Sequence, residues 1–265
     1  MKGIILAAGL GSRLSKYTKD CPKGLLPFLG KSLLDHQLGI MRELGINDIT
    51  IIKGYMADKI NIPEVNYYTN YKFKETNMVE SLFCAIEILE GPCIITYSDV
   101  IYEKALLETV LSSNKDIGVV VDDDFEDYWQ ARLGSKYLSD SESLVIKNGT
   151  IADIGNMSPS LEEINGRYVG IIKLSGIGSE IFKKTYLSYS NSGELNKLGN
   201  RVFNKWHMTD FLQSIIDKKI SVNPIFVSRG WLEFDTDEDY ETYQKWAETD
   251  TLNRFFRINN EVNID

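Results

Sequence analysis

The chain has 265 residues, a formal net charge of −9, 43% hydrophobic residues and 25% charged residues. This length suits one sizeable α/β domain, with or without a smaller elaboration, and two independent domains are not expected. The negative charge argues against a nucleic-acid or anionic-membrane partner, because such partners need a basic face. The three cysteines form neither a metal-ligand spacing nor an even disulfide set, so a reducing cytoplasm is expected.

The amino-terminal apolar run, residues 3–10, is followed at once by Arg13 and Lys16 and by no cleavage-site region, so it is not expected to be a signal peptide. No apolar run approaches the roughly 20 residues of a membrane-spanning helix.

Hydrophobic periodicity predicts an alternation of strands and helices in the first half of the chain. Strands are expected at residues 2–7, 48–53, 65–68, 92–97 and 117–121, and helices at 32–43, 79–89 and 104–111. Ser32 is the expected N-cap of the first helix, and Gly45 follows its end. Such alternation implies βαβ units and an α/β fold with a mainly parallel sheet flanked by helices.

The pattern changes after Val121. Residues 122–167 are expected to form a small β-rich insertion that includes a hairpin, with strands at 144–146 and 151–154 joined through Asn148 and Gly149. Strands at 168–174 and 221–227 and helices at 179–186, 209–217 and 237–246 then complete a domain spanning residues 1–248. The polar tail, residues 249–265, is expected to be disordered or to pack on a neighbouring molecule.

A glycine-bearing loop directly follows the first strand, at residues 8–14, and Pro22 and Lys23 follow it after a short connection. Small residues let backbone N–H groups approach phosphate oxygens, while Arg13 and Lys23 supply mobile cations. The loop is not a P-loop, because the GxxxxGK[ST] spacing is missing, and Leu14 replaces the third glycine of a dinucleotide fingerprint.

Together, in this order after a first strand, the two halves closely resemble the signature of the sugar-phosphate nucleotidyltransferase superfamily. The resemblance implies a Rossmann-like fold that binds an NTP in the loop, and it implies that Lys23 stabilises the attacked α-phosphate. The nucleotide-binding residues expected around the loop are Leu6, Ala7, Ala8, Gly9, Gly11, Ser12, Arg13 and Lys23. Asp99 is expected to bind the nucleotide as well.

Carboxylates near two strand ends are candidate magnesium ligands. Asp99 follows an apolar strand, at the sheet edge where α/β folds bind ligands. Glu233 and Asp235 would point to the same face of a later strand, and Mg²⁺ prefers oxygen ligands. The resemblance assigns Asp99 and Asp235 to the metal and Glu233 to an accessory role, whereas each acid on its own could equally be a helix cap or turn residue. The expected catalytic set is Arg13, Lys23, Asp99 and Asp235.

Three further segments, residues 76–82, 127–134 and 208–212 together with 230–233, resemble the cytidylyltransferase branch. That branch acts on phosphocholine and on phosphonates such as 2-aminoethylphosphonate, and the resemblance extends to about Tyr243. It implies that Asn77 and Ser81 lie on the base side of the nucleotide. The alternative is that they belong to an ordinary capped helix.

The acceptor pocket is expected to use the insertion and the second half of the sheet. Trp129, Tyr168 and Trp231 could form an aromatic enclosure for an ammonium group. Arg132 could bind the acceptor's phosphate bidentately, with Glu233 beside it. The acidic run 122–124 could pair with an amine. The alternatives are that the aromatic residues are core and that the acidic run faces solvent.

These features predict a cytoplasmic, magnesium-dependent nucleotidyltransferase that transfers CMP from CTP, or the equivalent from another NTP, to a small phosphorylated acceptor and releases pyrophosphate. The acceptor is already ionised, so no strong general base is needed, and His36 and His207 are expected to be structural. One alternative is a sugar-1-phosphate nucleotidyltransferase using UTP, dTTP or GTP. Another is an inactive nucleotide-binding regulator. A homodimer is left open.

Overall fold

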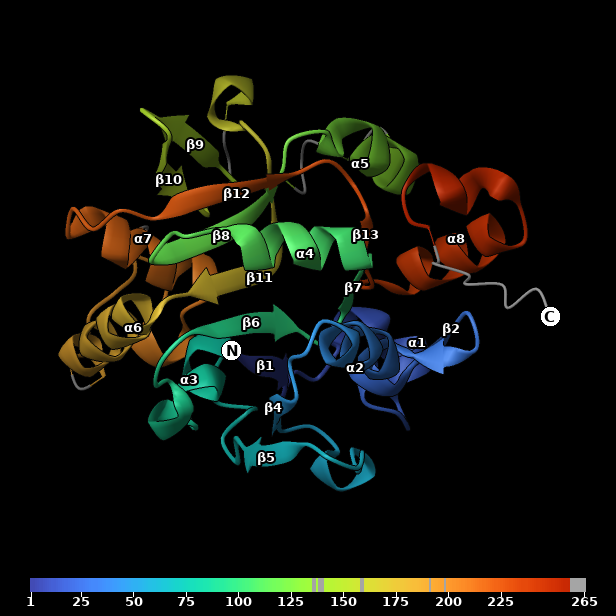
Figure 1. The fold of residues 1–265 in the computed structure, drawn as a ribbon, viewed down its shortest axis with the longest axis horizontal. Coiled ribbons are helices and arrows are strands. Elements are labelled where there is room, and N and C mark those ends of the chain that lie inside the picture. Colours follow the sequence, from blue (N-terminus) through green and yellow to red (C-terminus); the bar gives the residue numbers. More distant parts are fainter. Residues whose placement is uncertain (135–136, 138–140, 158–159, 191, 198, 258–265) are drawn as a thin grey trace.

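The computed structural model describes residues 1–134, 137, 141–157, 160–190, 192–197 and 199–257. Within them, a seven-stranded sheet runs in the order β12-β8-β11-β6-β1-β4-β5 (Figure 1). Its strands are β1 Lys2–Ala7, β4 Asp48–Lys53, β5 Asn66–Thr69, β6 Cys93–Tyr97, β8 Ile117–Asp122, β11 Arg167–Leu174 and β12 Asn223–Val227. Only β11 runs antiparallel to its neighbours, β6 and β8. The predicted mixed, mainly parallel sheet is confirmed.

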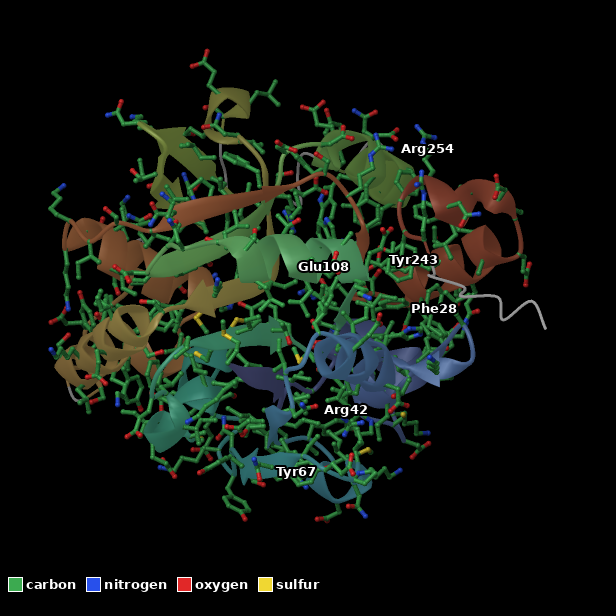
Figure 2. All side chains as sticks on the ribbon, in the orientation of Figure 1. Phe28, Arg42, Tyr67, Glu108, Tyr243 and Arg254 are labelled. Atoms are coloured by element: carbon green, nitrogen blue, oxygen red, sulfur yellow. The ribbon has the colours of Figure 1, made fainter. Side chains whose placement is uncertain are left out.

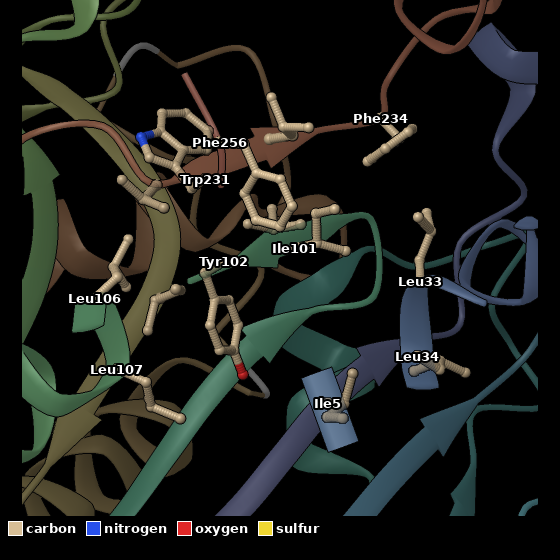
Figure 3. Packing of buried hydrophobic residues seen from close by; sticks show 14 of the residues in the cluster. Ile5, Leu33, Leu34, Ile101, Tyr102, Leu106, Leu107, Trp231, Phe234 and Phe256 are labelled. Carbon is tan, nitrogen blue, oxygen red and sulfur yellow. The ribbon is translucent and has the colours of Figure 1, made fainter. Parts of the chain in front are cut away.

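Helices cover both faces of this sheet, because side chains of a buried strand alternate between faces. The helices are α1 Ser15–Thr18, α2 Leu33–Glu43, α3 Met78–Phe83, α4 Lys104–Ser112, α5 Phe125–Leu133, α6 Gly176–Tyr189, α7 Met208–Asp217 and α8 Asp237–Ala247. Ile5 of β1 packs in a cluster with α2, α4, α5 and α8, whereas Ile4 and Leu6 pack in a second cluster with α3, α6 and α7. Figure 3 shows part of the first cluster, from Ile5 and Leu34 to Tyr102 and Trp231.

Two short strand pairs extend the architecture beside the main sheet. They are β2 Pro27–Phe28 with β3 Lys31–Ser32, and β7 Val100–Tyr102 with β13 Trp231–Glu233. The aromatic ring of Phe234, directly after β13, lies 5.0 Å from that of Phe28 and 5.1 Å from that of Tyr243 on α8. Phe28 and Tyr243 are labelled in Figure 2. This packing joins the carboxyl-terminal part of the chain to its beginning.

Local signals placed several element ends correctly. Ser32 caps α2 in a reciprocal capping box with Asp35, and Gly45 beyond its end has a φ of 79°. The predicted hairpin is present as β9 Leu144–Lys147 and β10 Thr150–Ile154, and its turn residues Asn148 and Gly149 both have positive φ. The helix predicted at 79–89 is shorter, because α3 ends at Phe83 and a 3₁₀ turn follows at Ile86–Ile88.

The insertion is less β-rich than predicted, since α5 precedes the hairpin. Phe125, Tyr128 and Trp129 recur at the i, i+3, i+4 spacing of a helix, and all three are buried. The remaining described 3₁₀ turns are Ser12–Leu14, Lys23–Leu25, Ala57–Lys59, Leu161–Glu163, Phe203–Lys205 and Asp250–Arg254.

The expectation for the tail is wrong for residues 250–257, and residues 258–265 lie outside the described part of the chain. Leu252, Phe255 and Phe256 are buried in the first cluster, and the Arg254 guanidinium pairs with Asp127 of α5. The tail therefore packs on its own chain, where the ring of Phe255 contacts Tyr128 of α5 and Trp246 of α8. Among the described helices, none is long and apolar enough to cross a bilayer.

We expect Phe255→Ala to lower the free energy of unfolding by about 3 kcal/mol, because it removes a buried ring that packs on Tyr128 and Trp246. Denaturant titration would measure the change. The control Leu187→Ala truncates an exposed side chain on α6 and should stay within about 0.5 kcal/mol of the parent protein. Equal effects in the two variants would contradict the packing of the tail.

Candidate functional site

Four parallel strands end at one edge of the sheet, and the candidate residues follow them. The pairings of Ala7 with Lys53, Lys53 with Thr69, and Leu6 with Tyr97 align the carboxyl ends of β1, β4, β5 and β6. The glycine loop, Asn70 and Asp99 therefore emerge close together. This is the edge where open α/β sheets bind ligands.

The glycine loop has a defined shape. Gly11 has a φ of 63°, which favours glycine, and its carbonyl accepts hydrogen bonds from Leu14 N–H and the Thr18 hydroxyl. At Gly54, after β4, a Cβ atom would lie 2.6 Å from the carbonyl oxygen of Ala8. Glycine at this position lets the segment approach the loop, and the N–H of Tyr55 donates to that carbonyl.

The four predicted catalytic side chains come together. Lys23 Nζ lies 2.9 Å from Asp99 Oδ2 and 3.3 Å from Asp235 Oδ1. A guanidinium nitrogen of Arg13 lies 2.7 Å from Asp235 Oδ2. We call these four residues the charged cluster. The Lys23 side chain is only 12% exposed, so its attraction to the carboxylates is weakly screened by water.

Burial and charge act in opposite directions on these groups. Burial lowers the pKa of Lys23, but the adjacent Asp99 and Asp235 carboxylates outweigh it and leave this pKa raised. Burial and the nearby Glu233 charge raise the pKa of Asp235 to about 6. The raised pKa of Lys23 favours its ammonium form, whereas the carboxyl of Asp235 binds a proton more readily than an ordinary aspartate.

A first cavity of about 370 Å³ lies on the glycine loop and the start of α3. Of the residues predicted to bind nucleotide, Leu6, Ala8, Gly9, Gly11, Ser12, Lys23, Asn77, Ser81 and Asp99 line it. Ala7 does not, because its side chain belongs to the hydrophobic core. Phe73, Thr76 and Tyr97 also line the cavity, and the sequence patterns did not single them out for this role.

A second cavity, of about 330 Å³, adjoins the first. Met78 and Tyr97 line both cavities, and Arg13 and Asp235 of the charged cluster line the second. Its wall also includes the predicted Tyr168 and Glu233, together with Glu142, Arg167, His207 and Thr209. The hydroxyl of Tyr168 lies 3.1 Å from that of Tyr97.

The predicted aromatic enclosure is wrong for two of its three members. Trp129 and Trp231 are 0% and 1% exposed, with ring centroids 5.7 Å apart, and neither lines either cavity. The Trp231 indole N–H donates to Asp122, whose carboxylate is buried as well. Asp123 bonds to Ser228, and Asp124 pairs with Arg229, so the acidic run 122–124 does not line the acceptor cavity.

Arg132 is also misassigned as a ligand for the acceptor's phosphate. Its side chain is 2% exposed, and its guanidinium binds both oxygens of Asp239 and one of Glu233. Asp239 in turn accepts the backbone N–H groups of Asp235 and Thr236. Arg132 therefore holds the segment that carries Asp235, although Arg132 itself is buried and lines neither cavity.

Besides Arg13, the second cavity is lined by Arg167, which directly precedes Tyr168 in β11. Its place next to the predicted Tyr168 was the available sequence signal. Glu142 lies within the insertion that was expected to contribute to the acceptor pocket, but no pattern singled out this residue. His207 was expected to be structural; it lines the cavity and also stands at the N-cap of α7.

The donor set at the charged cluster fits a magnesium ion. Asp99 Oδ1 is buried without a hydrogen-bond partner, and the Asp99 and Asp235 carboxylates converge on the same ammonium group. Mg²⁺ is usually held by one or two carboxylates, with waters and substrate phosphates completing its shell. Among the described residues, no group of three or more His, Cys, Asp or Glu is placed to hold a metal.

We expect Arg132→Met to lower the free energy of unfolding by about 3 kcal/mol or more, because the buried Asp239 and the partly buried Glu233 would be left without their cation. Thermal and denaturant unfolding would measure this. In the control Arg42→Met, the lost ion pair is with a largely exposed Glu64, and the change should stay below about 1 kcal/mol. A stable Arg132→Met protein that has lost only acceptor affinity would restore Arg132 as an acceptor ligand.

Comparison with known proteins identifies the family of the chain. Residues 3–153 match the family of the MobA-like NTP transferase domain. The CTP:phosphoglutamine cytidylyltransferase of Campylobacter jejuni subsp. jejuni serotype O:2 is 29% identical over 252 residues, covering 91% of this chain and 98% of that protein. The choline-phosphate cytidylyltransferase of Streptococcus pneumoniae is 36% identical over 107 residues, or 39% of this chain and 47% of that protein.

Solved structures share the fold. The CTP:phosphocholine cytidylyltransferase of Streptococcus pneumoniae superimposes with a TM-score of 0.66 at 23% identity, covering 93% of this chain and 98% of that one. The inositol-1-phosphate CTP transferase of T. maritima gives a TM-score of 0.67 at 19% identity, with 93% and 96% covered. The chain belongs to the MobA-like NTP transferase domain family and is a nucleotidyltransferase.

Proposed function

We propose that the enzyme is a cytidylyltransferase, which transfers CMP from CTP to a small phosphorylated or phosphonate acceptor and releases pyrophosphate. The observation that carries this proposal is the pair of adjoining cavities, with the charged cluster at their junction. The first cavity offers the glycine loop for a nucleotide, and the second is a separate space for an acceptor. A relative aligned over 91% of the chain is named a CTP-dependent cytidylyltransferase, which favours CTP.

The charged cluster supplies the electrostatics of nucleotidyl transfer. Lys23 lines the first cavity and Arg13 the second, so a triphosphate entering between them meets two cations. Their present partners, Asp99 and Asp235, are the residues that would hold Mg²⁺. Bound there, the ion would neutralise negative charge on the phosphates. Lys23 would stabilise the charge that develops at the α-phosphate, where its burial strengthens the interaction.

The acceptor needs alignment more than activation, because its phosphate or phosphonate is already ionised at neutral pH. The second cavity presents charges of both signs, with Arg13 and Arg167 as cations and Glu142 and Glu233 as anions. It also presents the ring of Tyr168, which can contribute a cation–π contact. This combination suits an acceptor that bears both a phosphate and an amine, such as the phosphocholine, phosphoglutamine or aminoethylphosphonate named for relatives.

A sugar-1-phosphate is the second candidate acceptor. The hydroxyls of Ser143 and Thr209 line the same cavity and could bind sugar hydroxyls. Relatives include a probable glucose-1-phosphate cytidylyltransferase of Bacillus subtilis, 35% identical over 93 residues. We favour the amine-bearing acceptor because the cavity presents the carboxylates of Glu142 and Glu233, which can pair with an amine, as well as cations for a phosphate. We propose a cytoplasmic location, where CTP and such acceptors are both present.

Pyrophosphate release should be measured with each of CTP, UTP, dTTP and GTP. Each nucleotide is combined with phosphocholine, phosphoglutamine, 2-aminoethylphosphonate or glucose-1-phosphate, with magnesium and with excess chelator. We expect turnover with CTP and an amine-bearing acceptor, and its loss on chelation. Turnover with the sugar phosphate alone, or with a nucleotide other than CTP, would reject the proposed specificity.

We expect Lys23→Ala to lower kcat by two or more orders of magnitude, because a preorganised charge next to the reacting phosphate is lost. Steady-state kinetics with CTP would measure this. The control Lys183→Ala removes a lysine that pairs with Glu180 on the distant α6, and it should keep the parent rate. A rate for Lys23→Ala within threefold of the parent enzyme would exclude the proposed role of Lys23.

A further inference from the structure

A buried asparagine behind the first cavity determines the direction of two hydrogen bonds. Asn70 follows β5 at the carboxyl edge of the sheet and is 3% exposed. Its side-chain oxygen accepts the N–H of Lys72 at 2.9 Å, which fixes the orientation of the amide. The amide nitrogen then donates to the hydroxyls of Thr76, at 2.9 Å, and Ser81, at 3.0 Å. Both hydroxyl-bearing residues line the first cavity.

The protons of both hydroxyls are already committed to backbone carbonyls. Thr76 donates to the carbonyl of Lys72 at 2.9 Å, and Ser81 donates to that of Asn77 at 3.3 Å. A hydroxyl has one proton and two lone pairs. With the proton on a carbonyl and one lone pair facing Asn70, a single lone pair remains on each oxygen. These two oxygens can therefore accept a hydrogen bond from a ligand, but they have no proton left to donate.

The neighbouring Asn77 does not alter this polarity. Its side-chain oxygen accepts the N–H of Met78 at the start of α3, and its amide nitrogen donates to the carbonyl of Lys205. Although Asn77 lines the cavity, its amide is engaged as a helix cap and as a link to the Phe203–Lys205 turn. The acceptors provided by side chains on this wall are the Thr76 and Ser81 oxygens.

Two hydroxyl oxygens that can only accept hydrogen bonds discriminate between pyrimidines. At position 4 cytosine carries an exocyclic amine, which donates, whereas uracil carries a carbonyl, which can only accept. A carbonyl against these oxygens would leave the groups on both sides unpaired, which is the kind of mismatch that binding sites reject most strongly.

We propose that Thr76 and Ser81 accept hydrogen bonds from the exocyclic amine of the nucleobase, and that Asn70 is the positioning residue that keeps their oxygens in the accepting orientation. This inference rests on the proposed use of CTP. It extends that proposal by naming the residues that distinguish cytosine from uracil.

The test compares CTP, UTP and the triphosphate of 2-pyrimidinone riboside, which differs from CTP only by lacking the amine. For the parent enzyme we expect kcat/KM to fall about tenfold or more from CTP to the 2-pyrimidinone triphosphate. In the Ser81→Ala, Thr76→Val double variant, the kcat/KM values for CTP and for the 2-pyrimidinone triphosphate should agree within about threefold. Asn70→Ala should also lower the ratio of kcat/KM for CTP to kcat/KM for UTP, because the hydroxyls of Thr76 and Ser81 would then be free to rotate and donate.

The matched control is Ser179→Ala. It removes a buried hydroxyl that bonds to the carbonyl of Gly91 and lines neither cavity. Its substrate ratios should equal those of the parent enzyme. Thermal unfolding of each variant, and the KM for the acceptor, separate lost stability from changed base selection, because a purely structural defect does not alter the ratio between two nucleotides.

The outcomes separate the two proposals. A parent enzyme that does not use CTP would reject the proposed function. A parent enzyme that uses CTP, but whose kcat/KM for the 2-pyrimidinone triphosphate lies within threefold of that for CTP, would overturn this inference alone. That comparison needs no variant. An unchanged CTP to UTP ratio in folded Asn70→Ala would overturn the positioning role of Asn70.

Discussion

The ammonium group of Lys23, held between Asp99 and Asp235, is the interaction on which the site depends. The lysine follows the glycine loop, one aspartate follows β6, and the other follows β13. Separated by up to 212 residues, these groups meet because β13 pairs with β7 and the N–H of Phe234 donates to the carbonyl of Asp99. A buried cation needs a carboxylate partner, so the ion pairs tie the end of the domain to its beginning.

Further charged side chains lie behind the cluster and are linked to it. Asp235 is next to Glu233, Glu233 binds Arg132, and Arg132 binds Asp239. Asp239 accepts the N–H of Asp235, which closes the series on itself. Arg132 lowers the pKa of Glu233 to about 2 although burial opposes the effect, so that carboxylate stays ionised within the protein. The arrangement fixes Asp235 through several buried contacts, as a site that relies on preorganised charge requires.

Substrate selection falls to walls that are separate from this common centre. The hydroxyls of Thr76 and Ser81 provide oxygen acceptors in the first cavity, and the second cavity draws on β11, α7 and the segment around Glu142. Phosphate chemistry can therefore stay constant while base and acceptor preferences change. A change of base preference would require a different hydrogen-bond direction at Asn70, Thr76 and Ser81.

The sequence by itself determined the features that depend on neighbours along the chain. The strands, the Ser32 cap, the Asn148-Gly149 turn and the glycine loop followed by Lys23 are local patterns. The fold class and the residues that meet in the charged cluster could therefore be predicted. Partners and burial could not, because they depend on residues far apart in sequence. Only the tertiary structure decided that Trp129 and Trp231 are core, that Arg132 is bound by Asp239, and that Asn70 orients two hydroxyls. An aromatic or cationic side chain has the same local signature in a core as in a pocket. The packing of the rest of the chain around it makes the difference.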